Sequence, residues 1–360
     1  IILDACKAGK DIYCEKPLTN TLIEAKLTMD AVNESGVIFQ TGSQQRASKN
    51  FRYACELVRN GRIGTIREVR VSVGGPPRPC DLAGEEMESF IGAVMDGAVD
   101  EVVVAAVLAT LRAKGETGIE IAAAARAMRA RALPVRIAEP MRAVDTCGTG
   151  GDGAETINIS KAAALLAAAA GVAVAKHGNR SVSSKCVSAD VLEAAGVRLD
   201  LAPDAMATLH DEIGIAFLFA PRLHPAMKAV MPVRRALGVR TGFNLRGPLT
   251  NPAGVTRLVI GVWGPDVQDL MASALAELGA RRALVVHSED GLDEISVNAP
   301  TRVLEIRDGD LVDDWKLEPA DLGIIAGDPA SLAGGGVEEN LYRMRDILGG
   351  SENSAASEAV

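Results

Sequence analysis

Aromatic side chains are scarce in this sequence: Phe, Trp and Tyr together make up 3% of its 360 residues. The core must therefore be built mainly from Ala, Val, Leu and Ile, which suits helices packed tightly on a sheet. Hydrophobic residues still reach 48% and charged residues 24%, a balance typical of a globular chain rather than a disordered one. At this length the chain has room for two domains.

Patterns for metal binding and for disulfides are also lacking. The six cysteines include no CxxC pair and are irregularly spaced, which argues against a zinc site or a disulfide framework and favours reduced thiols in a cytoplasm. The four histidines, His177, His210, His224 and His287, show no metal-ligand spacing. We therefore expect no zinc site.

We expect no signal peptide, and the sequence has no apolar run of membrane-spanning length. Its most apolar stretch, residues 162–175, is short and rich in Ala and Gly, so it predicts a buried helix followed by a strand. The net charge of −9 argues against nucleic acid as a partner, although a local basic pocket can still bind a small phosphorylated ligand. We expect a cytoplasmic protein. Because it begins with Ile1, we also expect the sequence to start inside a reading frame.

The chain changes character near Glu86. Residues 1–86 alternate short helical and strand-like segments, with a helix predicted at 21–35, a buried strand at 36–40 and a further strand at 65–73. The Gly- and Pro-rich stretch 74–79 then breaks regular structure. Residues 87–132 are Ala-rich and helical in period. From Val144 onward, apolar runs at 172–175, 216–219, 258–262 and 283–286 alternate with glycine loops and helical stretches, which predicts a parallel sheet covered on both faces.

The strongest local motif is the glycine-rich stretch CGTGGDG at residues 147–153. Glycines allow a sharp backbone turn that presents N–H groups to an anion, and the helix expected after Ser160 adds its positive end. The stretch contains GxGxxG, but the Ala-rich segment downstream lacks the acidic residue of a dinucleotide site, and no Lys-Ser/Thr ending supports a P-loop. It predicts a phosphate cradle, with a structural turn as the alternative.

Polar residues follow this loop and the next strand. Thr156, Asn158 and Ser160 supply hydroxyl and amide groups just past the loop. The KHGNR stretch at residues 176–180 comes directly after an apolar run, where Lys176 can neutralise a phosphate and Asn179 can orient a polar substrate. At the carboxyl end of a strand, such a basic loop favours a binding site over a solvated turn.

Two adjacent carboxylates, Asp293 and Glu294, follow the run at 283–286. A pair of carboxylates together with substrate phosphates suits Mg²⁺, a hard cation. The alternative is an acidic surface loop.

Taken together, these motifs resemble the anthranilate phosphoribosyltransferase family over roughly residues 87–350. The stretches that carry the resemblance are LRAKGET (111–117), GTGGDG (148–153), KHGNR (176–180), SADVLE (188–193), HPAM (224–227), VRRALG (233–238), GPLTNPA (247–253) and DGLDE (290–294). The resemblance implies a nucleoside-phosphorylase-like α/β fold, with a small helical domain, a larger parallel-sheet domain and an active site in the cleft between them. It also implies a homodimer.

The implied reaction joins phosphoribosyl pyrophosphate and anthranilate and releases pyrophosphate, in tryptophan biosynthesis. Carried over by matching position, the residues of the phosphoribosyl pyrophosphate site are Gly148, Gly151, Asp152, Thr156, Asn158, Ser160, Lys161, Lys176, Ser184 and Ser188. Gly148, Asn179 and Arg234 would bind anthranilate, and Ser160, Asp293 and Glu294 would bind Mg²⁺. No general acid or base is assigned.

Residues 1–86 resemble a different family, the Gfo/Idh/MocA oxidoreductases. The matching stretches are GKDIYCEKPL (9–18), QQR (44–46) and NGRIG (60–64), and Lys16 matches a residue that lies near nicotinamide and substrate in that family. The dinucleotide-binding glycines would lie upstream of this segment, so we expect no redox activity.

The resemblances divide the chain into an oxidoreductase-like fragment (1–86), an incomplete helical domain (87–141), an α/β domain lacking its closing helices (142–350) and a disordered tail (351–360). Val187 stands where the family has Gly, and Arg246 stands where it has an apolar residue, near the expected anthranilate channel. The alternatives are an inactive chimeric or misassembled chain, a pyrimidine-nucleoside phosphorylase-like enzyme and an NAD-dependent sugar oxidoreductase.

Overall fold

The computed structural model describes residues 2–16, 18–19, 22–42, 53, 55–57, 59–62, 81–154, 156–179, 188–324, 327–351 and 354–360. Contacts divide the chain into two compact units, Ile1–Pro76 and Pro77–Val360.

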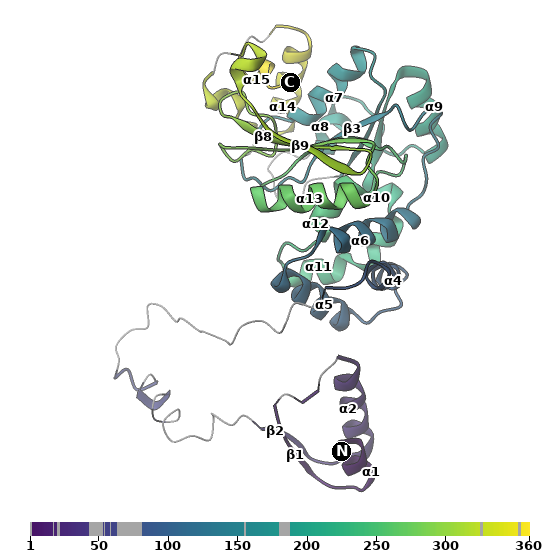
Figure 1. Ribbon diagram of the computed structural model, residues 1–360, viewed down its shortest axis with the longest axis vertical. Coiled ribbons are helices and arrows are strands. Elements are labelled where there is room, and N and C mark those ends of the chain that lie inside the picture. The colour runs from purple at the N-terminus through teal and green to yellow at the C-terminus, as the bar shows by residue number, and fades with distance from the viewer. Residues whose placement is uncertain are drawn as a thin grey trace. The chain divides into compact units, whose positions relative to one another are not determined.

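The first unit contains a parallel strand pair joined by a helix (purple in Figure 1). Its elements in order are α1 (Ile2–Lys7), β1 (Ile12–Glu15), α2 (Leu22–Ser35) and β2 (Phe39–Gly42). The helix predicted over residues 21–35 matches α2. The strand predicted at 36–40 begins later, and it is partly exposed rather than buried. The strand predicted at 65–73 lies outside the described residues.

A helical cluster opens the second unit. It comprises α4 (Gly84–Met95), α5 (Glu101–Lys114) and α6 (Gly118–Ala130), and α6 begins with a capping box between Thr117 and Glu120. The junction that the sequence placed at Glu86 therefore falls inside α4, because Glu86 closes the N-terminus of that helix by accepting a hydrogen bond from Ala83 N–H.

A later segment of the chain returns to this helical cluster. It contains η2 (Pro225–Ala229), α11 (Met231–Leu237) and α12 (Phe243–Arg246). Val233 and Phe243 from this segment share a buried core with Met87 and Leu108. The helical core is thus built from two stretches that are distant in sequence.

The described strands of the second unit form a seven-stranded sheet in the order β5-β4-β3-β6-β7-β8-β9. Their bounds are β3 (Val144–Gly148), β4 (Val174–Gly178), β5 (Ile215–Phe219), β6 (Arg257–Gly261), β7 (Arg282–Ser288), β8 (Thr301–Arg307) and β9 (Asp310–Leu317). The strands from β3 to β7 pair in parallel, as the apolar runs predicted.

The last two strands make the sheet mixed rather than parallel. β8 and β9 pair antiparallel, and β8 pairs antiparallel with β7. β8 and β9 are connected by Asp308 and Gly309, whose φ angles are 50° and 87°. An Asp-Gly pair with positive φ is a hairpin signal, which the sequence interpretation missed.

Helices cover both faces of the sheet (Figure 1). One face carries α6, α9 (Pro203–Ile213), α10 (Ala220–Leu223) and α13 (Pro265–Glu277), whose buried side chains join the main core with those of the strands. The other face carries α7 (Ile159–Ala169), α8 (Ser188–Ala194) and α14 (Val337–Leu348), which meet through Ala162, Val191 and Leu341. The remaining short helices are η3 (Gly247–Leu249), η4 (Pro319–Leu322), η5 (Pro329–Leu332) and α15 (Ala355–Glu358).

The expectation of a disordered tail at 351–360 was wrong for its described part. Residues 355–358 form α15, with Ser354 accepting a hydrogen bond from Ala356 N–H as the cap. Ala355 and Ala356 are buried in a small core with Ile157, Ile159 and Leu332. The side chains of Ala355 and Ala356 are small enough to pack closely in this core.

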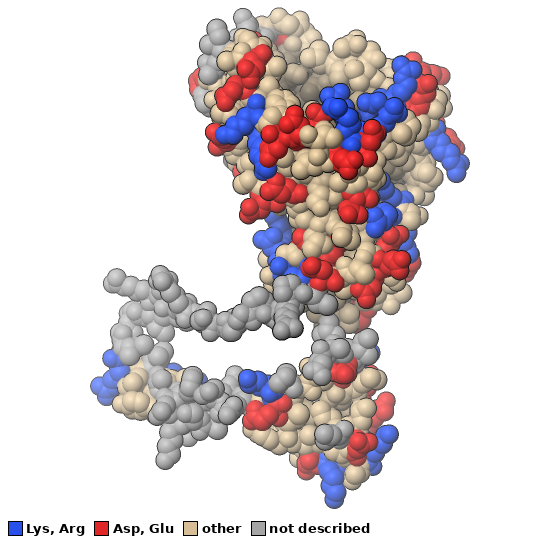
Figure 2. Space-filling model, viewed as in Figure 1, with Lys and Arg blue, Asp and Glu red and all other residues tan. Residues whose placement is uncertain are grey.

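The visible surface of the second unit carries no large area of one charge. Figure 2 shows acidic and basic side chains interleaved over this face. Among the described residues, no helix has the length and apolarity needed to cross a membrane.

Candidate active site

The predicted motifs meet at the carboxyl edge of the parallel strands. β3 ends at Gly148, β4 at Gly178 and β7 at Ser288, and parallel strands place these ends along one edge. The glycine-rich loop follows β3, Asn179 follows β4, and the DGLDE stretch follows β7. Gly150 N–H donates to Asp293 Oδ2 at 2.7 Å, across 143 residues of sequence.

Two glycines allow Asp293 to approach the strands this closely. A Cβ on Gly148 would lie 2.6 Å from Asp293 Oδ2, and a Cβ on Gly261 would lie 1.5 Å from the Asp293 carbonyl oxygen. Thr149 N–H donates to Gly261 O at 2.9 Å, which ties the start of the loop to β6. Side chains at positions 148 and 261 would separate the loop from the acidic stretch.

The loop itself depends on backbone conformations that favour glycine. Gly150, Gly151 and Gly153 have φ of 64°, 87° and 78°. Asp152 Oδ1 accepts from Ala154 N–H at 3.2 Å, which closes the turn. The predicted sharp turn is therefore present, and its backbone is held by neighbouring elements.

The acidic residues at this edge lie close together. Asp152 Oδ2 accepts from Asp293 N–H at 3.4 Å. Burial, and then the charge of Asp152, raise the pKa of Asp293 to about 6. Burial, and then the charge of Asp293, raise the pKa of Glu294 to about 8, although Lys176 and Lys161 oppose the shift. The shifts indicate that this group of carboxylates favours additional positive charge.

Lys176 is buried in β4 beside this acidic group. It is 5% exposed, and its Nζ donates to the carbonyl oxygen of Thr146 and lies 3.2 Å from Thr146 Oγ1. Its charge also opposes the raised pKa of Glu294. Lys176 is therefore a charged group held inside the sheet edge rather than in a solvated turn.

The start of α7 lies against β3. Asn158 is the N-cap residue, and Ser160 and Lys161 lie in the first turn. Thr146 Oγ1 donates to Ser160 O at 3.1 Å, which fixes this turn against β3. Thr156 pairs with Ala333 in an isolated antiparallel bridge, so the loop before α7 is also anchored. The positive end of the helix dipole thus lies near the glycine-rich loop.

Arg234, expected to bind anthranilate, lies on α11. Its guanidinium is 5.8 Å from the centroid of the Phe243 ring, and burial lowers its pKa. Asn179 is exposed just past β4. Ser184 and Val187 lie outside the described residues, and Ser188 is the first residue of α8.

A buried histidine pair was missed by the sequence interpretation. His177 Nε2 and His224 Nε2 are 3.1 Å apart, and His177 Nδ1 lies 3.2 Å from Gly247 O. Because that carbonyl only accepts, His177 Nδ1 carries the proton and its Nε2 accepts from His224. Burial lowers the pKa of His177 to about 3 and that of His224 to about 4. The available signal was that His177 lies near the carboxyl end of β4 and His224 lies a few residues after the neighbouring strand β5.

A second buried polar cluster was also missed. Asp145 in β3 accepts from Asn251 Nδ2 at 2.9 Å and from His177 N–H at 3.2 Å. Burial raises the pKa of Asp145 to about 6, and the charge of Lys176 opposes that shift. Asn251 also donates to Ala175 O at 2.8 Å, so the GPLTNPA stretch is hydrogen-bonded to both β3 and β4.

The fold and this site define a class of glycosyl transferase. The helical bundle domain of the glycosyl transferase family matches residues 77–132, and its a/b domain matches residues 140–360. The described helical cluster and mixed sheet fall within these two matches.

Similar proteins narrow the class to one family. Anthranilate phosphoribosyltransferase of Desulfatibacillum aliphaticivorans is 52% identical over 271 residues, which cover 75% of this chain and 80% of the relative. That of Moorella thermoacetica is 48% identical over 274 residues, covering 76% and 80%. The chain belongs to the anthranilate phosphoribosyltransferase family.

Solved structures agree with the sequence comparison. The crystal structure of the Thermus thermophilus enzyme matches with a TM-score of 0.73 and 47% identity, covering 78% of this chain and 83% of that one. The Saccharomyces cerevisiae enzyme in complex with PRPP and Mg matches with a TM-score of 0.70 and 25% identity, covering 77% and 81%.

Proposed function

We propose that this chain transfers the phosphoribosyl group of phosphoribosyl pyrophosphate to the amine of anthranilate and releases pyrophosphate. The observation that carries the proposal is the meeting of the glycine-rich loop with Lys176, Asp293 and Glu294 at one sheet edge, in a chain about half identical to named members of the family. We assign the step to tryptophan biosynthesis and the enzyme to the cytoplasm.

The donor site would use the residues around the loop. Backbone N–H groups near Gly148, Gly151 and Asp152, together with the N-terminus of α7, present partial positive charge to phosphate oxygens. Lys176 and Lys161 add full charges, and Thr156, Asn158, Ser160, Ser184 and Ser188 complete the proposed set. These groups favour departure of pyrophosphate because they stabilise the charge that develops on it.

Mg²⁺ is the proposed cofactor, held by Asp293, Glu294 and Ser160. The raised pKa values of Asp293 and Glu294 fit such an ion, since a cation would replace protons on these buried carboxylates. Among the described residues, no group of three or more His, Cys, Asp or Glu side chains could hold a metal alone, so substrate phosphates would complete the coordination. When bound, Mg²⁺ would neutralise charge on the diphosphate.

The acceptor site would use Arg234, Asn179 and Gly148. A guanidinium suits the carboxylate of anthranilate because it presents paired donors in a fixed plane. Positioning of a weakly nucleophilic amine can supply much of the rate without a general base. We assign none.

The test is loss of anthranilate fluorescence when phosphoribosyl pyrophosphate and Mg²⁺ are added to the purified chain. We expect turnover that disappears in Arg234→Ala and persists in Arg136→Ala, an exposed arginine outside the site. Phosphorolysis of thymidine or uridine, measured in parallel, would favour the pyrimidine-nucleoside phosphorylase alternative. A folded chain with neither activity would overturn the proposal and leave an inactive composite chain.

We also propose that the first unit, Ile1–Pro76, derives from a Gfo/Idh/MocA-like oxidoreductase. It is followed by a helical domain that begins before α4 and extends to about residue 141, and by an α/β domain at residues 142–350. Support comes from the separate contact unit Ile1–Pro76, whose β1 and β2 are parallel and joined by a helix as in dinucleotide-binding folds. No redox activity is expected. Saturable binding of NAD(H) or NADP(H) by the chain would contradict that expectation. A homodimer is proposed from the family, and sedimentation would test it.

A further inference from the structure

Arg240 reaches the glycine-rich loop from a distant part of the second unit. Its Nη2 donates to the carbonyl oxygen of Gly151 at 2.6 Å. Its guanidinium also lies over the Trp263 ring, 4.8 Å from the centroid. A Cβ at Gly151 would lie 2.7 Å from Arg240 Nη2, so the arginine covers the loop where that residue has no side chain.

The backbone that carries Arg240 is well anchored. Arg240 lies between α11 and α12, and Val233 and Phe243 of these helices are buried in the helical core. The next residue, Thr241, is buried, and its N–H donates to Asn244 Oδ1 at 3.1 Å. On the other side, Trp263 directly follows Val262, whose N–H donates to Val286 O at 3.0 Å. The backbone beside Arg240 and beside Trp263 is therefore held by hydrogen bonds and packing, although the Arg240 side chain is exposed.

This contact determines where the next amide points. A trans peptide unit is planar, so its C=O and N–H groups point in opposite directions. When Arg240 holds Gly151 O, the N–H of Asp152 is turned to the opposite side of the loop. Asp293 holds the preceding turn through Gly150 N–H. Because Gly150 and Gly151 have positive φ and many accessible conformations when unconstrained, the loop depends on such contacts to present its amides.

We propose that Arg240 is a positioning residue for the donor site: it fixes the Gly151–Asp152 peptide so that the Asp152 amide can bind a phosphate oxygen of the donor. The inference rests on the proposed function for the identity of the donor. In this role Arg240 makes no contact with the reacting atoms. Its effect is transmitted through the loop, and the Trp263 ring holds the guanidinium in place for that purpose.

The kinetic test compares Arg240→Gln, Arg240→Lys and Trp263→Leu with the wild type. For Arg240→Gln we expect KM for phosphoribosyl pyrophosphate to rise about tenfold, which is the effect expected from losing one charge-assisted hydrogen bond. KM for anthranilate should change little. Arg240→Lys should recover part of the loss, because an ammonium can still donate to Gly151 O. Trp263→Leu should also raise KM for phosphoribosyl pyrophosphate, because the guanidinium loses the ring that holds it. Arg136→Gln removes the same charge outside the site and should change neither constant.

A binding measurement separates this inference from the proposed reaction. Calorimetric titration with inorganic pyrophosphate and Mg²⁺ should show about tenfold weaker binding to Arg240→Gln than to the wild type. That result would support the positioning role even if no variant turned over anthranilate, an outcome that would overturn the proposed reaction alone. Unchanged pyrophosphate affinity and unchanged donor KM in Arg240→Gln would overturn the inference. So would equal losses in both KM values with a lowered melting temperature, since they indicate a general structural role.

Discussion

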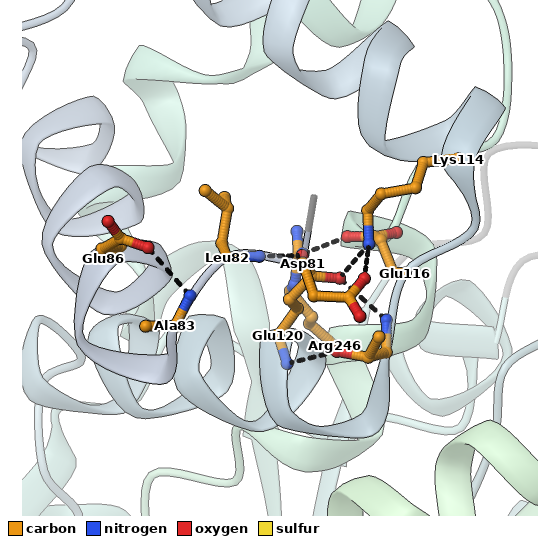
Figure 3. A network of polar contacts seen from close by, with 9 residues as sticks. Asp81, Leu82, Ala83, Glu86, Lys114, Glu116, Glu120 and Arg246 are labelled. Carbon is orange, nitrogen blue, oxygen red and sulfur yellow. Dashed lines mark hydrogen bonds and ion pairs between the residues drawn. The ribbon is translucent and has the colours of Figure 1, made fainter. Parts of the chain in front are cut away.

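Arg246 and Glu116 form a buried ion pair between α12 and the turn that joins α5 to α6. The Arg246 side chain is 0% exposed and that of Glu116 is 7% exposed, and Arg246 Nη2 donates to Glu116 Oε1 (Figure 3). The guanidinium lies 4.8 Å from the Phe243 ring centroid, and among the described residues its Nε and Nη1 atoms have no hydrogen-bond partner. Burial lowers the pKa of Arg246, while Glu116 opposes that shift.

The first prediction concerns the stability of this pair. Glu116→Gln leaves the buried guanidinium without its counter-charge, so we expect a loss of about 3 kcal/mol in the free energy of unfolding. The double variant Arg246→Leu with Glu116→Met removes both charges and should be about as stable as the wild type, or more stable. Urea denaturation measures both.

The matched control lies in the same network. Asp81 is 60% exposed and pairs with Lys114 at 2.8 Å, and Lys114 also pairs with the buried Glu120 (Figure 3). Asp81→Asn should cost less than about 1 kcal/mol, because exposed pairs are screened by water. A loss in Asp81→Asn as large as that in Glu116→Gln would contradict the argument from burial.

The second prediction concerns the His177–His224 pair. Because burial holds their pKa values at about 3 and 4, neither ring should take up a proton between pH 8 and pH 5. Nuclear magnetic resonance of the histidine ring protons, with His224→Gln for assignment, measures this. A midpoint near 6.5 for either ring would show that the pair is accessible to protons.

The sign for stability follows from those shifts. In the unfolded chain both rings take up protons below about pH 6.5. In the folded chain neither ring takes up a proton until the pH falls to about 4. The neutral pair therefore makes its full contribution to the free energy of unfolding above pH 6.5. This contribution is lost as the pH falls, by up to about 1.4 kcal/mol per pH unit for each ring. Asp145, with its pKa raised to about 6, acts in the opposite direction. The change in the free energy of unfolding with pH should therefore be measured for both the wild type and His224→Gln. The difference between the two removes the contribution of Asp145, which is present in both.

The third prediction concerns Gly148. Gly148→Ala would place a methyl group 2.6 Å from Asp293 Oδ2, so the Asp293 carboxylate must shift and its hydrogen bond from Gly150 N–H is disturbed. We expect weaker donor binding, seen as a KM for phosphoribosyl pyrophosphate raised about tenfold or more. Gly84→Ala is the control, because the nearest atoms to its new Cβ lie at 3.5 Å and Ala suits the first turn of α4. Equal KM values in the two variants would refute the steric argument.

The fourth prediction concerns the proposed Mg²⁺ ligands. Glu294→Gln removes a carboxylate next to Asp293, so the Mg²⁺ concentration for half-maximal turnover should rise about tenfold or more. Glu289→Gln is the control on the same loop, since Glu289 is exposed and pairs with Lys316. Chelation of Mg²⁺ should abolish turnover in every variant. A Mg²⁺ requirement unchanged in Glu294→Gln would remove this residue from the site.

The sequence by itself determined the fold class of the second unit and the order of many of its strands and helices. The apolar runs located β4, β5, β6 and β7, because buried parallel strands need continuous apolar stretches. The glycine-rich loop and the DGLDE stretch were recognisable because their chemistry depends on residue type and local spacing. The β8–β9 hairpin was also encoded locally, by Asp308-Gly309, although the interpretation passed over it.

Only the tertiary structure decided which of these pieces touch. The contact of Gly150 with Asp293, that of Arg240 with Gly151, and the burial of Arg246 against Glu116 each join residues about 90 or more positions apart. Local periodicity carries no information about such pairs, because they depend on strand order and on how the α11–α12 segment returns to the helical core. The same holds for the neutral state of His177 and His224, since their pKa values follow from burial that only packing creates.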